Sequence, residues 1–116
     1  MKDYSAMSDF EINKQVAIAL ELKPYYEDGS YSNDGLFVVT RGTLCLGRWN
    51  PCNEPHQAWP IIAGNKISLD FDGDGYEPQQ NAWCKASTQC GHVYYGIEKE
   101  PLRNAMIVYL QMMEQK

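Results

Sequence analysis

Residues 100–113, EPLRNAMIVYLQMM, decide the fold that this sequence predicts. Proline is favoured at the first position of a helix, so Glu100-Pro101 predicts a helix start. Apolar residues then recur at helical spacing and form a stripe: Leu102, Ala105, Met106, Tyr109 and Met113. Other apolar residues within 107–110 widen this stripe, and we therefore expect the helix to be covered on two sides.

A second helix is predicted near the start of the chain, over Asp9–Leu22. Ser8 and Glu11 have the spacing of a capping box, in which two side chains satisfy free backbone donors at a helix start. Apolar residues follow at helical period: Ile12, Val16, Ala19 and Leu20. Pro24 ends the helix, because the residue before a proline disfavours helical backbone.

Strands are predicted between these two helices. Short runs rich in β-branched, aromatic and other apolar residues indicate them: 36–40, 43–48, 67–69, 82–86 and 93–97. Asn53 has a suitable side chain to cap a short helix through 56–59, and Pro60 either limits that helix or starts a second turn. This order predicts an α+β fold, a small antiparallel sheet with the N- and C-terminal helices packed together on one face. The length of 116 residues predicts a single domain over 1–116.

The composition excludes several classes of partner. Lys plus Arg number 10 and Asp plus Glu number 15, a net charge of −5, whereas duplex nucleic acid and anionic membranes both require a basic surface. The longest clear apolar run, Ala105–Leu110, is far shorter than the roughly 18 residues of a membrane span. No apolar segment of signal-peptide length follows Met1, so we expect a cytoplasmic protein without membrane or duplex nucleic-acid partners.

Cysteine and histidine residues raise the question of disulfides or metal. The sequence contains four cysteines: Cys45, Cys52, Cys84 and Cys90. Free thiols are expected in a cytoplasmic protein. A zinc site would recruit His92 and His56, but the intervals between the paired cysteines are longer than the two to four residues of structural zinc sites. We therefore expect neither a disulfide nor a metal.

An acidic segment matches the first half of a calcium-binding loop. Asp70, Asp72 and Asp74 alternate and are followed by Gly75, as oxygen ligands are in such loops. The twelfth position should be a bidentate glutamate, and here it is Asn81. Asp-Gly also supplies the positive φ of a hairpin turn. We interpret the segment as a hairpin turn.

Tryptophan side chains are candidates for ligand or partner binding. Aromatic residues make up 12% of the chain, with three Trp and eight Tyr. Their rings can stack on a base, fill a core or anchor a partner. Trp59 has apolar neighbours in the sequence, and we expect it in the core. Trp49 lies between Arg48 and Asn50, and we expect it to be partly exposed.

Arg103 lies in the first turn of the last predicted helix, where its positive charge opposes the helix dipole. This cost predicts a partner for the guanidinium. An acidic side chain such as Glu100 or Glu11 is one interpretation. A ligand anion is the other, because helix amino ends favour anions and arginine binds them with two parallel hydrogen bonds.

Three stretches together resemble a known family. They read YSAMSDFEINKQVAIAL over 4–20, PCNEPHQAWPIIAGNKISL over 51–69 and EPLRNAMIVYLQMM over 100–113. Their order and spacing are similar to the NinX-like family of small proteins carried by lambdoid phages and prophages of enteric bacteria. The resemblance implies an accessory phage protein that acts in the host cytoplasm, in a family without an established activity.

Each of these stretches carries apolar residues that it cannot bury alone, so we expect all three to share one core. Their polar members would then lie at the rim of this junction. With the two tryptophans they make up the predicted ligand- or partner-binding residues: Glu11, Asn13, Trp49, Asn53, Trp59 and Arg103. No cofactor is expected.

The function predicted from these features is that of a non-enzymatic accessory protein of phage origin. It would modulate the host by binding a host protein or by sequestering a small nucleotide-like ligand. Two alternatives belong to other classes of protein. One is a small hydrolase or transferase that uses His56 or His92, and the other is a structural homo-oligomer, such as a homodimer, that associates through the Met-rich last helix.

Overall fold

The structure is a computed structural model that describes residues 4–24, 26, 28–32, 37–40, 47–72, 83–97 and 100–114. Three α-helices and five strands are formed within this part of the chain. In chain order the elements are a short 3-10 helix η1 (Tyr4–Ala6), α1 (Asp9–Ala19), β1 (Val38–Thr40), β2 (Gly47–Trp49), α2 (Pro55–Gly64), β3 (Ser68–Asp72), β4 (Trp83–Ser87), β5 (Val93–Ile97) and α3 (Pro101–Glu114).

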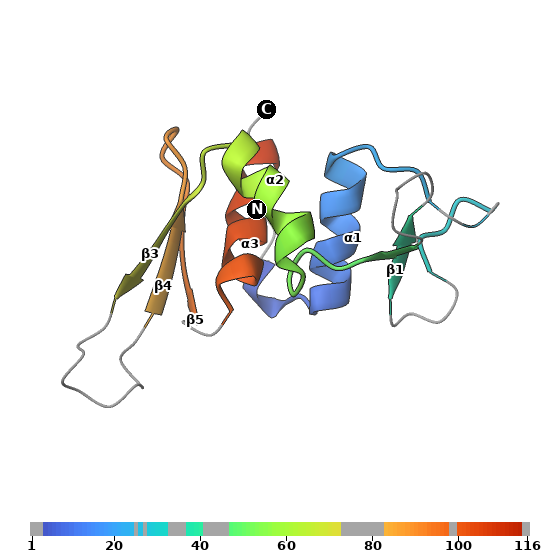
Figure 1. The fold of residues 1–116 in the computed structure, drawn as a ribbon, viewed down its shortest axis with the longest axis horizontal. Helices are drawn as coiled ribbons and strands as arrows, with labels where there is room; N and C mark the ends of the chain where they lie inside the picture. Colours follow the sequence, from blue (N-terminus) through green and yellow to red (C-terminus); the bar gives the residue numbers. More distant parts are fainter. Residues whose placement is uncertain are drawn as a thin grey trace.

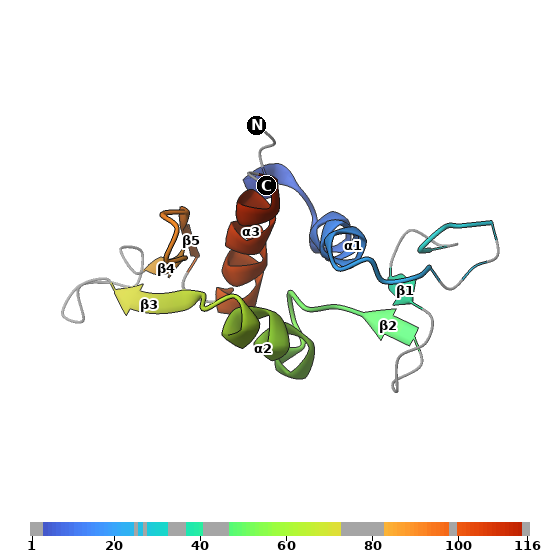
Figure 2. The same ribbon diagram turned by 90° about the horizontal axis from the view of Figure 1, so that it is seen from above.

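The helix α3 is the central element of the fold. It packs against the antiparallel sheet β3-β4-β5 on one side and against α1 on another, while α2 crosses it (Figures 1 and 2). The antiparallel pair β1-β2 lies beyond α1, so the strands form two small sheets with helices between them. The predicted α+β fold, with terminal helices packed together, is confirmed. No helix within the described residues is both long and apolar enough to cross a membrane.

The core forms around α3, whose residues 104–110 are all buried. Side chains from the other elements pack against this segment: Ile12 and Val16 of α1, Ile61 and Ile62 of α2, and Ala86 of β4. The three stretches that carry the resemblance therefore share one core, as predicted. Two methionines of α3, Met106 and Met112, are buried within this core.

The helix α1 begins as predicted and ends three residues early. The Ser8 hydroxyl accepts a hydrogen bond from the backbone N–H of Glu11 at 3.2 Å, which caps the helix. At the other end Glu21 adopts a left-handed φ of 60°, and the N–H of Leu22 donates to the Ala17 carbonyl at 2.9 Å. This Schellman motif ends the helix at Ala19 rather than at the predicted Leu22.

The helix α2 differs from its prediction at both ends. Asn53 does not cap it, because Glu54 occupies the cap position and makes no side-chain capping bond. Pro55 instead supplies the first residue, where a missing N–H costs nothing. Pro60 does not limit the helix, which continues to Gly64. Pro60 is exposed on the outer side of this helix.

The prediction that Trp59 belongs to the core is wrong, since 65% of its surface is exposed. Ala58, Ile61 and Ile62 form the buried face of α2. Helical geometry then turns the intervening Trp59 to the outside. Trp49 is half-buried against the core, as predicted.

The strands lie close to their predicted positions. The strand predicted at 93–97 is β5. Within the described residues the ends of the other predicted strands differ from the observed ends by at most three residues, and β2 pairs with β1 through Arg48 opposite Val39. The residues that join β4 to β5 turn at Gly91, which has a left-handed φ of 97°. Parts of the predicted strands at 36 and 43–46 lie outside the described residues.

Candidate functional site

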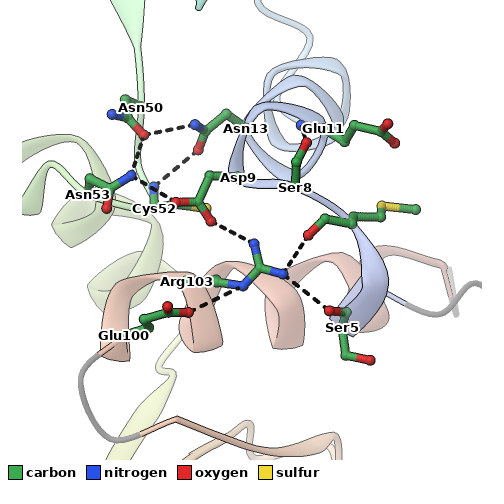
Figure 3. A network of polar contacts seen from close by, with 11 residues as sticks. Ser5, Ser8, Asp9, Glu11, Asn13, Asn50, Cys52, Asn53, Glu100 and Arg103 are labelled. Carbon is green, nitrogen blue, oxygen red and sulfur yellow. Dashed lines mark hydrogen bonds and ion pairs between the residues drawn. The ribbon is translucent and has the colours of Figure 1, made fainter. Parts of the chain in front are cut away.

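A polar network joins the amino ends of α1 and α3 to the loop between β2 and α2 (Figure 3). Its centre is Arg103, whose side chain is 13% exposed. Nη1 lies 2.6 Å from Asp9 Oδ1, and Nε lies 3.5 Å from Glu100 Oε2. Nη2 donates to the backbone carbonyls of Met7 at 2.6 Å and Ser5 at 3.4 Å. All three guanidinium nitrogens therefore have protein acceptors.

The prediction that an acidic side chain pairs with Arg103 is confirmed for Glu100 and wrong for Glu11. Asp9 takes the place of Glu11, because residues two positions apart on a helix face different directions. Asp9 is the first residue of α1, where the helix dipole favours a carboxylate. Its second oxygen, Oδ2, accepts from Asn53 Nδ2 at 3.1 Å, so one carboxylate links α1, α3 and the loop before α2.

Asn13 holds the loop that follows β2. It is 4% exposed, its Nδ2 donates to Asn50 Oδ1 at 2.8 Å, and its Oδ1 accepts from the N–H of Cys52 at 3.1 Å. Asn53 Nδ2 donates to the same Asn50 oxygen at 3.0 Å. Because Asn50 Oδ1 accepts two hydrogen bonds, the orientation of its amide is determined, and its Nδ2 has no acceptor among the described residues.

Gln57 fixes the same loop from the side of α2. Its Oε1 accepts from the N–H of Asn50 at 2.6 Å, and its Nε2 donates to the carbonyl of Arg48 at 2.9 Å. The loop is therefore held by α1 and α2 at once. This bracing places Asn50 in a defined position beside the amino end of α1 (Figure 3).

A depression of about 190 Å³ opens beside this network. One part of its wall is aromatic and the other carries amides and a carboxylate; the lining residues are Asp9, Phe10, Asn13, Phe37, Val38, Trp49, Asn50 and Asn53. The guanidinium of Arg48 lies 4.0 Å from the centre of the Phe37 ring, a cation–π contact that holds that ring. Among the described residues, Trp49 Nε1 is the buried side-chain polar atom that has no hydrogen-bond partner.

Two other depressions adjoin the first. One of about 190 Å³ shares Asp9 and Asn53 and extends over Cys52 and the first turn of α3. Arg103 in its wall pairs with Asp9 and Glu100, and burial raises the pKa of the Cys52 thiol, which keeps it protonated and unreactive. The other, of about 320 Å³, lies on the far side of Phe10, between α1 and residues 29–32.

The structure brings together half of the residues predicted for binding. Asn13, Trp49 and Asn53 line the first depression. Arg103 lines the second, while Glu11 and Trp59 line none of the three. Sequence reasoning missed five residues that line the first depression: Asp9, Phe10, Phe37, Val38 and Asn50. In the sequence, Asp9 is recognisable only as an acidic residue at a helix start, and Asn50 only as a residue before a proline. Their roles in the depression depend on contacts between segments that are distant in the sequence.

The two histidines lie apart from these depressions. His56 Nδ1 is 3.6 Å from Glu54 Oε2, and the two side chains are 64% and 49% exposed, which describes a surface pair. His92 lies between β4 and β5, where its backbone N–H donates to Thr88 Oγ1 at 3.2 Å. Neither histidine lines any of the three depressions.

Metal-ligating side chains do not gather in the described part of the chain, where no group of three or more His, Cys, Asp or Glu residues could hold an ion. Asp70 pairs with Lys85 at 3.8 Å across the sheet. Asp72 is the last residue of β3, so it belongs to a strand and not to a turn, and the remainder of the predicted acidic turn, including Asp74, lies outside the described residues. Free thiols are found at three cysteines: Cys52, Cys84 and Cys90. Cys45 lies outside the described residues.

A comparison with family models gives a match over almost the whole chain. The matching family is described as "Bacteriophage P22, NinX", and the match covers residues 3–113. It includes all three stretches on which the resemblance rests. The comparisons with curated proteins and with solved structures give no match.

Proposed function

The chain belongs to the bacteriophage P22 NinX family, and from this premise we propose that it is a phage-encoded accessory protein that binds a small planar ligand. Binding, without chemical conversion, would take place in the depression between α1 and the β1-β2 pair. The protein would act in the host cytoplasm and modulate the host by withholding this ligand.

The observation that carries the proposal is the buried indole N–H of Trp49, which has no partner within the described part of the chain. Leaving such a donor unpaired costs about 1–3 kcal/mol, and native proteins rarely retain that cost without a use. Asn50, at the same depression, carries a second donor, Nδ2, for which the described residues provide no acceptor. These two donors belong to residues that line the depression together with Phe37, and this combination favours a flat ligand with hydrogen-bond acceptors.

Size and charge narrow the class of ligand. The volume of about 190 Å³ is below the roughly 300–1,000 Å³ of sites for drug-sized molecules, so a single ring system fits better than a whole nucleotide. The Asp9 carboxylate lines the depression and the chain carries a net charge of −5, and both disfavour a phosphate. Arg103 does not offset this, because its guanidinium is engaged by protein acceptors. A neutral nucleobase, free or as a nucleoside, meets these conditions.

The proposal is tested by calorimetric titration of the protein with the common nucleobases, nucleosides and nucleoside monophosphates. We expect a base or nucleoside to bind more tightly than its monophosphate. Trp49→Phe keeps an aromatic ring and removes the N–H, so it should weaken that binding about fivefold or more. Trp59→Phe is the matched control, because it makes the same change on the outer face of α2.

Two results would contradict the proposal. One is the absence of binding by any member of the panel at millimolar concentration. The other is equal affinity in the Trp49→Phe and Trp59→Phe proteins. Capture of a host protein that depends on Trp49 would assign the depression to a protein partner instead.

A further inference from the structure

The outer face of α2 carries an exposed tryptophan in uncharged surroundings. Trp59 is 65% exposed, and the exposed residues around it are small or cyclic: Pro55, His56, Pro60, Ala63 and Gly64. No Asp, Glu, Lys or Arg occurs from Pro55 to Asn65. Figure 2 shows α2 at the outer edge of the molecule, with α1 and α3 on its inner side. A tryptophan in such a position is typical of a contact with another protein.

The charges that flank this face are arranged symmetrically. Glu54 precedes α2 and Lys66 follows it, both are exposed, and each lies six positions from Pro60. When two copies of α2 pack antiparallel about Pro60, Glu54 of each copy lies level with the partner's Lys66. The helix dipoles are then also antiparallel, which is the favourable arrangement. The flanking charges of this face are thus complementary to those of a second copy.

The small residues of α2 provide space for the tryptophan of a second copy. Side chains on a helix tilt toward its amino end. In an antiparallel pair, the indole of the partner's Trp59 therefore tilts toward Ala63 and Gly64. A Cβ built on Gly64 meets no atom within 4 Å, so the surface there is open.

We propose that this face of α2 binds a second copy of the same chain, antiparallel and with Trp59 as the anchor. Each copy carries a net charge of −5, and the uncharged face is where two copies approach with little repulsion. A ten-residue helix is only about 15 Å long, shorter than standard protein interfaces require, so the dimer is expected to be weak and reversible. The proposal is independent of the ligand, because Gln57 and not Trp59 is the α2 side chain that contacts the loop of the depression.

Disulfide trapping tests the register. Residue 60 lies on the twofold axis of the proposed dimer, so Pro60→Cys should form a cross-linked dimer under mild oxidation. The background is Cys45→Ser with Cys90→Ser, because Cys90 is exposed while Cys52 and Cys84 are buried. Ile18→Cys, at a side chain on α1 that is 47% exposed, is the control and should stay monomeric.

A mixture of Glu54→Cys and Lys66→Cys proteins in the same background tests the orientation. Antiparallel packing predicts mostly mixed cross-links between the two variants. Predominant cross-links between identical variants would overturn the antiparallel arrangement. Equal cross-linking by Pro60→Cys and Ile18→Cys would show random collision and overturn the proposal as a whole.

Sedimentation equilibrium measures the role of the anchor. Trp59→Ala should weaken self-association about tenfold or more, as expected for a central aromatic contact, and circular dichroism should show an unchanged fold. Ile18→Ala should associate like the wild type. Lys66→Glu should weaken association, and adding Glu54→Lys should restore it. A wild-type protein that stays monomeric up to millimolar concentration would overturn the proposal.

Discussion

Arg103 Nη1 lies 2.6 Å from Asp9 Oδ1, so an ion pair joins the first turns of α1 and α3 across 94 positions of sequence. An arginine at a helix start is unfavourable alone, and an aspartate at a helix start is favourable alone. Together they neutralise each other at a place where Arg103 is largely buried. The pair therefore closes the junction on which the candidate site is built.

Arg103→Ala should destabilise the fold. It removes the ion-pair partner of Asp9 and the hydrogen bonds that Arg103 donates to the carbonyls of Ser5 and Met7, so we expect the free energy of unfolding to fall by about 1–3 kcal/mol. Urea denaturation measures this loss. Lys14→Ala, at an exposed position of α1, should change it by less than about 0.5 kcal/mol. Arg103→Lys should recover only part of the lost free energy of unfolding, because an ammonium group lacks the planar set of N–H donors of a guanidinium. A loss below about 0.5 kcal/mol for Arg103→Ala would refute the structural role.

Gly96→Ala should disrupt the packing of α3 on its sheet. A Cβ at Gly96 would lie 2.0 Å from Asn104 Oδ1, and Asn104 is only 2% exposed, so its side chain has little room to move. We expect a loss of about 1–3 kcal/mol in the free energy of unfolding. Gly64→Ala is the control, because the added Cβ meets open space and alanine favours a helix. In the Asn104→Ala background the Gly96→Ala change should cost at least about 1 kcal/mol less, and strictly additive losses would contradict the contact.

Tyr4 should make stability depend on alkaline pH. Burial, followed by its hydrogen bond to Glu114 and the charge of that carboxylate, raises the pKa of Tyr4 to about 12, from 10.0 in the unfolded chain. The folded state thus favours the neutral phenol. Its contribution is fully present below pH 10 and is lost as the pH rises toward 12. Denaturant unfolding of Tyr4→Phe across this range should show a shallower decline than the wild type, whereas Tyr95→Phe, at an exposed site, should not. Identical declines in all three proteins would count against the buried phenol.

The cysteines should differ in their reactivity toward alkylating reagents. Cys90 is exposed, whereas Cys52 and Cys84 are buried, and burial raises the pKa of both buried thiols. Since the thiolate is the reactive form, Cys90 should be modified first in the native protein and the other two only on unfolding. Mass spectrometry of a Cys45→Ser protein after brief treatment should show one modification. Two or three modifications at the same rate would show that the core is open to solvent.

The starts of α1 and α3 were predictable from the sequence, whereas the start of α2 and the ends of α1 and α2 were not. Ser8 and Pro101 carry local signals whose physical action does not depend on the rest of the fold. The ends of α1 and α2 depend on left-handed residues, Glu21 with φ 60° and Lys66 with φ 54°. Such positions are usually glycine, so the ordinary sequence signal is missing at both.

The candidate site was predictable only as a set of polar residues near a shared core. Asn13 and Asn53 carried amides that the junction brings together. The link through Asp9, by contrast, depends on how two helix starts approach each other, which local patterns do not encode. Trp59 was misplaced because its apolar neighbours were considered as a run, whereas the helical spacing of Ala58, Ile61 and Ile62 turns it outward.

The central position of α3 has a consequence during synthesis of the protein. α3 contacts α1, α2 and all three strands of its sheet, yet it follows every one of them in the chain. Until residues 101–114 have left the ribosome, the earlier elements have no common surface on which to pack. Contacts this distant in sequence also slow the folding reaction. The nascent chain therefore exposes the apolar faces of α1 and α2 to chaperones for as long as the ribosome takes to complete α3.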